Sequence, residues 1–110
     1  MDIKRITGNK KQFLDLLLLG DEQESMIDRY LNRGEMFVLY DCGKVISACT
    51  VTDEGEGVYE IKNIAVYPEY QRKGYGRQFI GFLFGYYRDK CHTLIVGTGE
   101  STQTIPFYKN

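Results

Sequence analysis

The stretch that decides the fold runs from residue 66 to residue 76 and reads Val-Tyr-Pro-Glu-Tyr-Gln-Arg-Lys-Gly-Tyr-Gly. An apolar run ends at Val66, Pro68 closes it, and a polar loop with two glycines follows. After the loop, apolar residues recur at helical spacing, at Phe79, Ile80, Leu83, Phe84 and Tyr87. The first N–H groups of a helix lack intrahelical partners, and the helix dipole is positive there. The stretch therefore predicts a strand, a loop and a helix whose N-terminus suits a phosphate.

The strand that leads to Val66 carries an irregularity in its apolar pattern. Tyr59 and Ile61 fall on odd positions, whereas Ile64 falls on an even one, as Val66 does. One extra residue shifts everything after it to the other face of a sheet, so the slip predicts a β-bulge at Lys62-Asn63. The alternative interpretation is that the strand simply ends early at these two residues.

The remaining pattern predicts helices and strands on both sides of this unit. We expect strands at 3–6, 36–40, 45–52, 58–66 and 93–98, and helices at 10–19, from the residue after Asp21 up to Gly34, and at 79–87. Asp21 is expected to cap the second helix, with Glu24 completing a capping box. A short helix is expected at 101–108. Gly81 and Gly85 lie four residues apart in the third helix, which favours close packing of that face against the sheet.

Composition bounds the possible functions. The 110 residues predict a single domain, and 14 Lys and Arg against 15 Asp and Glu give a net charge of −1. This balance argues against a general nucleic-acid binder. No apolar run approaches the roughly 20 residues that cross a bilayer, so we expect no membrane partner. The three cysteines form no Cys-x-x-Cys pair, which argues against a disulfide framework or a metal site and favours a cytoplasmic location.

Two common phosphate motifs do not fit the loop. It lacks the Walker A pattern, and a dinucleotide fingerprint that opened at Gly74 would need glycine where Phe79 stands. By contrast, the Val-x-Pro strand end, Gln71-Arg72-Lys73-Gly74-Tyr75-Gly76 and the later Phe107-Tyr108 resemble the acetyl-CoA-binding motif of the GNAT superfamily of N-acetyltransferases. The resemblance extends over nearly the whole chain and is least specific in the first 35 or so residues.

The resemblance implies an α/β (α+β) fold, with a mixed, mostly antiparallel sheet flanked by helices, in one acetyl-CoA-binding domain spanning 1–110. The family normally continues past the residue matched by Tyr108 through two further strands, so we expect a sheet that lacks its last two strands. The strand 94–98 would then have an unpaired edge, and a homodimer through this edge is a possible consequence.

The resemblance also implies a site for acetyl-CoA, which acts as the acetyl donor. The backbone of the loop would hold the pyrophosphate, and the pantetheine arm would pair with the strand backbone after the bulge. The implied cofactor-binding residues are Ile64, Ala65, Val66, Gln71, Arg72, Lys73, Gly74, Tyr75, Gly76 and Ser101. Ser101 stands where the family often has asparagine, and its side chain has a shorter reach. No metal is implied.

Two residues are implied in catalysis. Glu60 precedes the bulge, where the family often places a general base, although orienting the substrate or facing solvent is an equally weighted role. Tyr108 matches a tyrosine that protonates the departing thiolate, with packing beside Phe107 as the alternative. His92 and Cys49 are more simply a surface residue and a core residue.

These observations predict an N-acetyltransferase that moves the acetyl group of acetyl-CoA directly to a primary amine in a ternary complex. A small-molecule amine is the favoured acceptor. The alternative is a CoA-binding regulatory or degenerate module without transferase activity. A third, weaker hypothesis is a protein-interaction domain that uses the unpaired strand edge.

Overall fold

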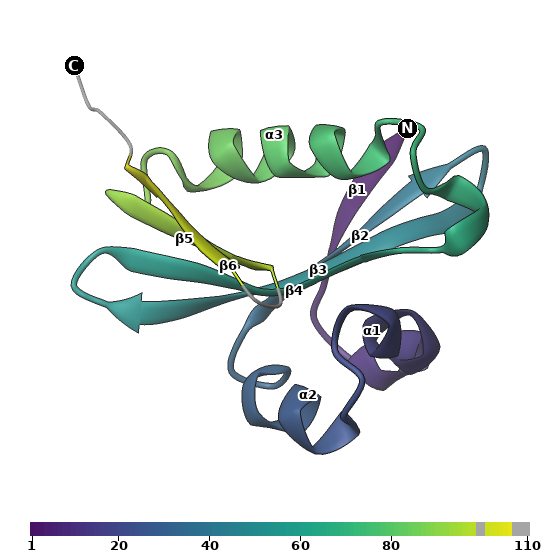
Figure 1. Ribbon diagram of the computed structural model, residues 1–110, viewed down its shortest axis with the longest axis horizontal. Coiled ribbons are helices and arrows are strands. Elements are labelled where there is room, and N and C mark those ends of the chain that lie inside the picture. Colours follow the sequence, from purple (N-terminus) through teal and green to yellow (C-terminus); the bar gives the residue numbers. More distant parts are fainter. Residues whose placement is uncertain (99–100, 107–110) are drawn as a thin grey trace.

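The computed structural model describes the backbone of residues 1–98 and 101–106 and the side chains up to residue 96. Within these residues six strands form one sheet in the order of the sequence (Figure 1). The strands are β1 (Asp2–Ile6), β2 (Glu35–Asp41), β3 (Lys44–Gly55), β4 (Val58–Val66), β5 (Thr93–Thr98) and β6 (Ser101–Pro106). Neighbours are antiparallel except β4 and β5, which are parallel. The predicted mixed, mostly antiparallel sheet is confirmed.

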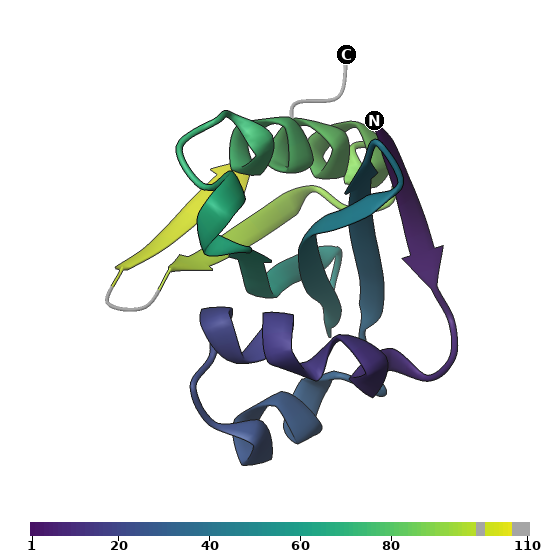
Figure 2. The same ribbon diagram turned by 90° about the vertical axis from the view of Figure 1, so that its right-hand side faces the viewer.

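Helices cover both faces of this sheet, α3 on one side and α1 and α2 on the other (Figures 1 and 2). They are η1 (Lys10–Phe13), α1 (Leu14–Gly20), α2 (Glu24–Tyr30), η2 (Pro68–Tyr70) and α3 (Tyr75–Tyr87). In the described part of the chain, no helix has the length and apolar character that a membrane span requires.

The second predicted helix begins later than its capping pattern suggested. Gln23 occupies the N-cap position of α2, and Oδ1 of Asp21 accepts a hydrogen bond from the backbone N–H of Gln23 at 3.3 Å. Asp21 therefore closes a turn ahead of the helix, and the expected capping box does not form. Side chains of this type compete equally well for local turns, which is why the pattern alone placed the start too early.

The sheet separates two cores. On one face α3 buries Phe79, Leu83 and Tyr87 against the sheet residues Phe37, Leu39, Ile46, Cys49, Val51, Ile61, Leu94 and Val96. On the other face α1 and α2 bury Leu16, Leu17, Ile27, Tyr30 and Leu31 against Met36, Val38, Ala48 and Ala65. Along β2 alternate residues thus serve alternate cores, as the pleat requires, whereas register irregularities shift this alternation in β3 and β4.

The predicted bulge in β4 is confirmed. Thr50 of β3 pairs with Asn63 and the next residue, Val51, pairs with Ile61, so Lys62 is the extra residue. Pairing of β4 with β5 covers Val58–Ile61 and, in the described chain, does not continue past the bulge. The second half of β4 therefore pairs with β3 on one side and leaves its other side without a strand partner.

The expected helix at 101–108 is wrong, because residues 101–106 form β6 antiparallel to β5. Thr102, Thr104 and Ile105 are β-branched, which disfavours a helix and favours a strand. Leu94 pairs with Ile105, so the β5 edge that we expected to be unpaired is covered by β6. The sheet thus has a strand where a helix was expected, and the stated reason for a dimer through β5 falls away.

Candidate functional site

A groove of about 560 Å³ lies between α3 and the second half of β4. Its walls are Ile64 and Val66 from β4 and Gly76, Arg77, Ile80, Gly81 and Phe84 from α3. The bulge is what turns Ile64 and Val66 to this side, because it shifts the alternation of β4 by one residue. The volume falls within the range of about 300–1,000 Å³ that small-molecule sites occupy.

Glycine keeps this groove open along α3. A Cβ atom added to Gly76 or Gly81 would meet no described atom within 4 Å, and the same holds for Gly85. The prediction that Gly81 and Gly85 pack closely against the sheet is therefore wrong. Glycine at position 81 destabilises the helix relative to alanine, but the absence of a side chain there leaves room in the groove for a ligand.

The loop before α3 exposes backbone N–H groups at one end of the groove. Arg72 and Gly74 have positive φ angles of 64° and 89°, and Gly74 is the N-cap of α3. Across the described chain, the N–H groups of Arg72, Lys73 and Gly74 donate to no backbone or side-chain acceptor. Those of the first helical turn lack intrahelical partners as well. Together with the exposed cations of Arg72 and Lys73, these groups favour an anion.

The second half of β4 directs backbone groups toward the groove that no strand of the described chain pairs with. The N–H of Tyr67 donates to the Ile46 carbonyl of the β3 side at 3.1 Å. Backbone groups alternate in direction along an antiparallel pair, so those of Ile64 and Val66 face away from β3. The Val66 carbonyl there accepts a hydrogen bond from Nε2 of Gln71 at 3.0 Å, which anchors the loop to the strand.

A charged cluster lies on the opposite face of β4. Glu60 forms an ion pair with Lys62, and Nζ of Lys62 also lies 3.4 Å from Oε1 of Glu54. Nη1 of Arg33 reaches Oε2 of Glu54 at 3.1 Å. Burial alone would lower the pKa of Lys62, but the hydrogen bonds and charges of the two carboxylates outweigh it and raise that pKa. Lys62 therefore stays charged and holds both carboxylates in place.

Asn63 fixes the bulge to the helices beneath it. Its Nδ2 donates to the Leu17 carbonyl at 2.9 Å and to the hydroxyl of Tyr30 at 3.0 Å. That hydroxyl donates to Oδ2 of Asp21 at 3.3 Å, and burial is the main cause that raises the pKa of Tyr30 to about 12. The chain from Asn63 to Asp21 thus joins the bulge to the segment between α1 and α2.

A second pocket, of about 390 Å³, lies beside this cluster and is here called the α2 pocket. Its lining residues are Asp21, Met26, Arg29, Tyr30, Arg33 and Lys62. It lies on the α1 and α2 side of the sheet, whereas the groove lies on the α3 side. The bulge of β4 separates the two, at the level where β4 and β5 stop pairing.

Comparison with known proteins agrees with this geometry. The family model of the acetyltransferase (GNAT) family matches residues 10–110. The chain belongs to this family. It is 32% identical to the uncharacterized N-acetyltransferase YvbK of Bacillus subtilis (strain 168) over 94 residues, which cover 83% of this chain and 59% of that protein. The chain thus spans about three-fifths of the length of this curated relative.

Solved structures of the GNAT family share the fold of this chain. One is a GNAT family acetyltransferase from Elizabethkingia anophelis with acetyl-CoA bound, at 32% identity and a TM-score of 0.84, covering 91% of this chain and 66% of that one. Another is a Bacillus subtilis acetyltransferase in complex with CoA, at 29% identity and a TM-score of 0.82, covering 90% and 66%. Both were solved with a ligand of the kind that the loop motif predicts.

The structure brings most of the predicted GNAT site residues together at one groove. Ile64, Val66 and Gly76 line it, and the loop from Gln71 to Tyr75 closes one end. Ala65 does not face it, because its side chain is buried in the core under α1 and α2. The side chain of Ser101 and all of Tyr108 lie outside the described residues. Glu60 lies on the opposite face of β4, where it forms an ion pair with Lys62.

Sequence reasoning missed the α3 wall of the groove and the individual residues that line the α2 pocket. The sequence predicts only helix packing for Ile80, Gly81 and Phe84, although the four-residue spacing of Gly81 and Gly85 is a usable signal. The α2 pocket has no such signal, because its walls come from residues 21–33 and from β4, which are far apart in the sequence.

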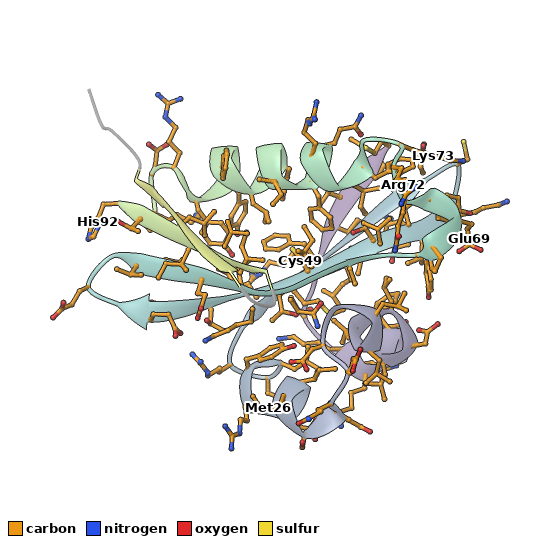
Figure 3. The ribbon with its side chains drawn as sticks, viewed as in Figure 1. Met26, Cys49, Glu69, Arg72, Lys73 and His92 are labelled. Carbon is orange, nitrogen blue, oxygen red and sulfur yellow. The ribbon has the colours of Figure 1, made fainter. Side chains whose placement is uncertain are left out.

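His92 and Cys49 have the structural roles expected of them. Nε2 of His92 lies 2.6 Å from the Glu56 carbonyl in the turn between β3 and β4. Figure 3 shows His92 at the opposite end of the sheet from Arg72 and Lys73. Cys49 is buried in the core under α3, and burial raises the pKa of its thiol. Among the residues that the structure describes, no three His, Cys, Asp or Glu side chains gather as metal ligands would.

Proposed function

We propose that the chain binds acetyl-CoA in the groove between β4 and α3 and transfers the acetyl group directly to a primary amine in a ternary complex. One observation carries the proposal. An apolar groove runs from a loop of free N–H groups along the unpaired side of β4. A ligand with a phosphate at one end and an extended amide-bearing arm matches both parts.

Each part of acetyl-CoA has a counterpart in this arrangement. The pyrophosphate would accept hydrogen bonds from the loop between Gln71 and Gly76, with the charges of Arg72 and Lys73 nearby. The amides of the pantetheine arm would pair with Ile64 and Val66 in the manner of an added strand. The arm would lie along Ile80 and Gly81, and the acetyl group would reach the bulge.

The transfer then needs a neutral amine and a stabilised oxyanion. The nitrogen attacks the thioester carbonyl carbon, the C–S bond breaks, and the thiolate leaves with a proton. An alkylamine is protonated at neutral pH, so a base must first remove one proton. We assign this role to Glu60, directly or through water, and assign stabilisation of the oxyanion to a backbone N–H between Ile64 and Val66. Tyr108 is the proposed proton donor to the thiolate.

A second candidate function is CoA binding without transfer. The ion pair between Glu60 and Lys62 favours it, because a carboxylate held by an ammonium group is less available to a substrate amine. The two candidates differ in one measurable product. Release of free CoA thiol in the presence of an amine panel indicates transfer, whereas binding of acetyl-CoA without amine-dependent thiol release indicates the binding module.

The groove is tested by two matched glycine substitutions in α3. Gly81→Leu places a side chain in the groove, whereas Gly85→Leu adds the same side chain at a helical position outside its lining. Both replace a helical glycine, so both are expected to stabilise the helix by about 0.5–1 kcal/mol. In calorimetric titration with acetyl-CoA, we expect Gly81→Leu to weaken binding at least ten-fold and Gly85→Leu to leave it unchanged.

The unmodified chain sets the reference for this comparison. Micromolar binding of acetyl-CoA corresponds to about −8 kcal/mol and is the expected result. If the two leucine variants bind acetyl-CoA equally well, the groove is not the binding site. Unfolding curves of both variants show whether a loss of binding reflects a loss of fold.

A further inference from the structure

The α2 pocket carries charges that are not all neutralised within the protein. Lys62 and Arg33 are paired with Glu60 and Glu54. Arg29 is exposed, and in the described part of the chain it forms no ion pair. Asp21 lines the same pocket and likewise has no ion-pair partner among the described residues, although it accepts hydrogen bonds from Tyr30 and Gln23. In the described chain the pocket therefore contains one cation, Arg29, and one carboxylate, Asp21, that form no ion pair with each other or with another residue.

These two charges differ in exposure, because Asp21 is half-buried and Arg29 is exposed. Asp21 follows Gly20, where an added Cβ would meet the Asn63 side chain and the Ile64 carbonyl, and Asp21 is linked to Asn63 through the hydroxyl of Tyr30. Asp21 therefore lies on the bulge side of the pocket. Arg29 projects from the exposed side of α2, next to Met26 and Arg33 at helical spacing. A ligand with its ammonium group toward the bulge would place an anionic group within reach of Arg29.

We propose that the α2 pocket holds the acceptor and selects a small amine that also carries a carboxylate, such as an amino acid. The proposal rests on the proposed function, because it takes the groove on the other face as the acetyl-donor site. Asp21 attracts the ammonium group to the bulge, and the guanidinium of Arg29 binds the carboxylate in its two-pronged geometry. Met26, which is 39% exposed, provides an apolar surface for the substituent of the acceptor.

The test compares acids with the amines that lack their carboxylate. L-phenylalanine is paired with 2-phenylethylamine, and L-methionine with 3-(methylthio)propylamine. Each is titrated by calorimetry into the chain saturated with CoA, so that binding is measured without any transfer. We expect at least one acid to bind ten-fold or more tightly than its partner amine, because a site built for a polar group rejects the analogue that lacks it.

Two arginine variants locate the effect. Arg29→Gln removes the charge at an exposed helical position and should abolish the preference for the acid. Arg88→Gln is the matched control, because Arg88 is also exposed and follows α3, away from the pocket lining. The proposal is overturned if acid and amine bind alike, if neither binds, or if the preference survives in Arg29→Gln.

Failure of the transferase proposal gives a different result. If the chain binds an acid in an Arg29-dependent way but releases no CoA thiol from acetyl-CoA with that acid, the specificity of the pocket stands and transfer is contradicted. If thiol is released equally with both members of each pair, transfer stands and the carboxylate preference is contradicted.

Discussion

Glu60 and Lys62 are the residues on which the proposed chemistry depends most directly. Their side chains share the α2 face of β4, and the bulge at Lys62 keeps them at the level where β4 leaves β5. Lys62 also contacts Glu54, so it is shared between two carboxylates. If Glu60 breaks its ion pair with Lys62 in order to act as a base, Lys62 still keeps its ion pair with Glu54.

We therefore predict that Glu60→Gln lowers kcat of amine-dependent CoA release by about 10²-fold or more, the scale of general-base catalysis. Glutamine keeps the size and the hydrogen-bonding capacity of the side chain but cannot accept the proton. Binding of acetyl-CoA, measured by titration, should not change, because Glu60 is not part of the groove lining.

Glu54→Gln is the matched control for this substitution. It removes the other carboxylate partner of Lys62 and the ion pair with Arg33, but leaves Glu60 intact. If both glutamine variants lose activity to the same extent, the role of Glu60 is to balance the charge of Lys62, and the assignment as base is contradicted.

At the scale of elements, a side-chain contact ties the end of β2 to the start of α3. The hydroxyl of Tyr75 donates to Oδ2 of Asp41 at 2.6 Å. This hydrogen bond is the main cause that lowers the pKa of Asp41 in the folded chain. A carboxyl with a lowered folded pKa contributes stability above its unfolded pKa of about 3.9, and this contribution is lost as the pH falls through the folded value.

Asp41→Asn is therefore expected to unfold at lower denaturant concentration than the unmodified chain at pH 7. The difference should begin to shrink as the pH falls below about 4 and should be lost below the lowered pKa of the folded carboxyl, where Asp41 is protonated in both states. Urea unfolding at several pH values measures it. Tyr75→Phe removes the same hydrogen bond and should flatten the pH dependence similarly. A difference that is constant from pH 7 to pH 2 contradicts the role of this contact.

The elements that the sequence predicts well are those with local signals. The strand, loop and helix between residues 58 and 87 were predicted because apolar periodicity, Pro68 and Gly74 each mark a boundary. The bulge was predicted because Tyr59 and Ile64 fall on opposite phases of one strand. Each of these signals lies within about ten residues, the range over which backbone preference and side-chain alternation act.

The elements that the sequence did not predict depend on contacts between distant segments. Strand β6 is formed by pairing with β5. The family pattern favours a helix at these residues, although Thr102 and Thr104 are β-branched and favour a strand. The groove depends on how far α3 stands from β4, and the glycine spacing within α3 indicates the face that borders the groove but not this distance. The α2 pocket needs Arg29 and Lys62 to meet across more than thirty residues of chain.

For the whole molecule, the proposed ligand would join α3 to β4 and the loop between them. A ligand that binds the folded chain alone stabilises it by RT ln(1 + [L]/Kd), about 2.7 kcal/mol at one hundred times Kd. In a domain of this size that corresponds to a rise in Tm of about 10 °C. We expect this rise for acetyl-CoA in thermal unfolding.

The variants in α3 provide the reference for this rise. Gly81→Leu at the same acetyl-CoA concentration should show a much smaller shift than Gly85→Leu. A ligand-independent Tm in the unmodified chain would contradict binding to the folded state.

The placement of the groove has a consequence for how relatives of this chain diverge. Every residue that lines the groove lies between positions 64 and 84, in one continuous segment of the chain. Most of the α2 pocket comes from positions 21–33, and it shares no lining residue with the groove. Substitutions in the early segment can therefore alter what the pocket accepts while the groove keeps its shape. Natural variation can thus change the α2 pocket without changing the groove, because the walls of the two come from different segments of the sequence.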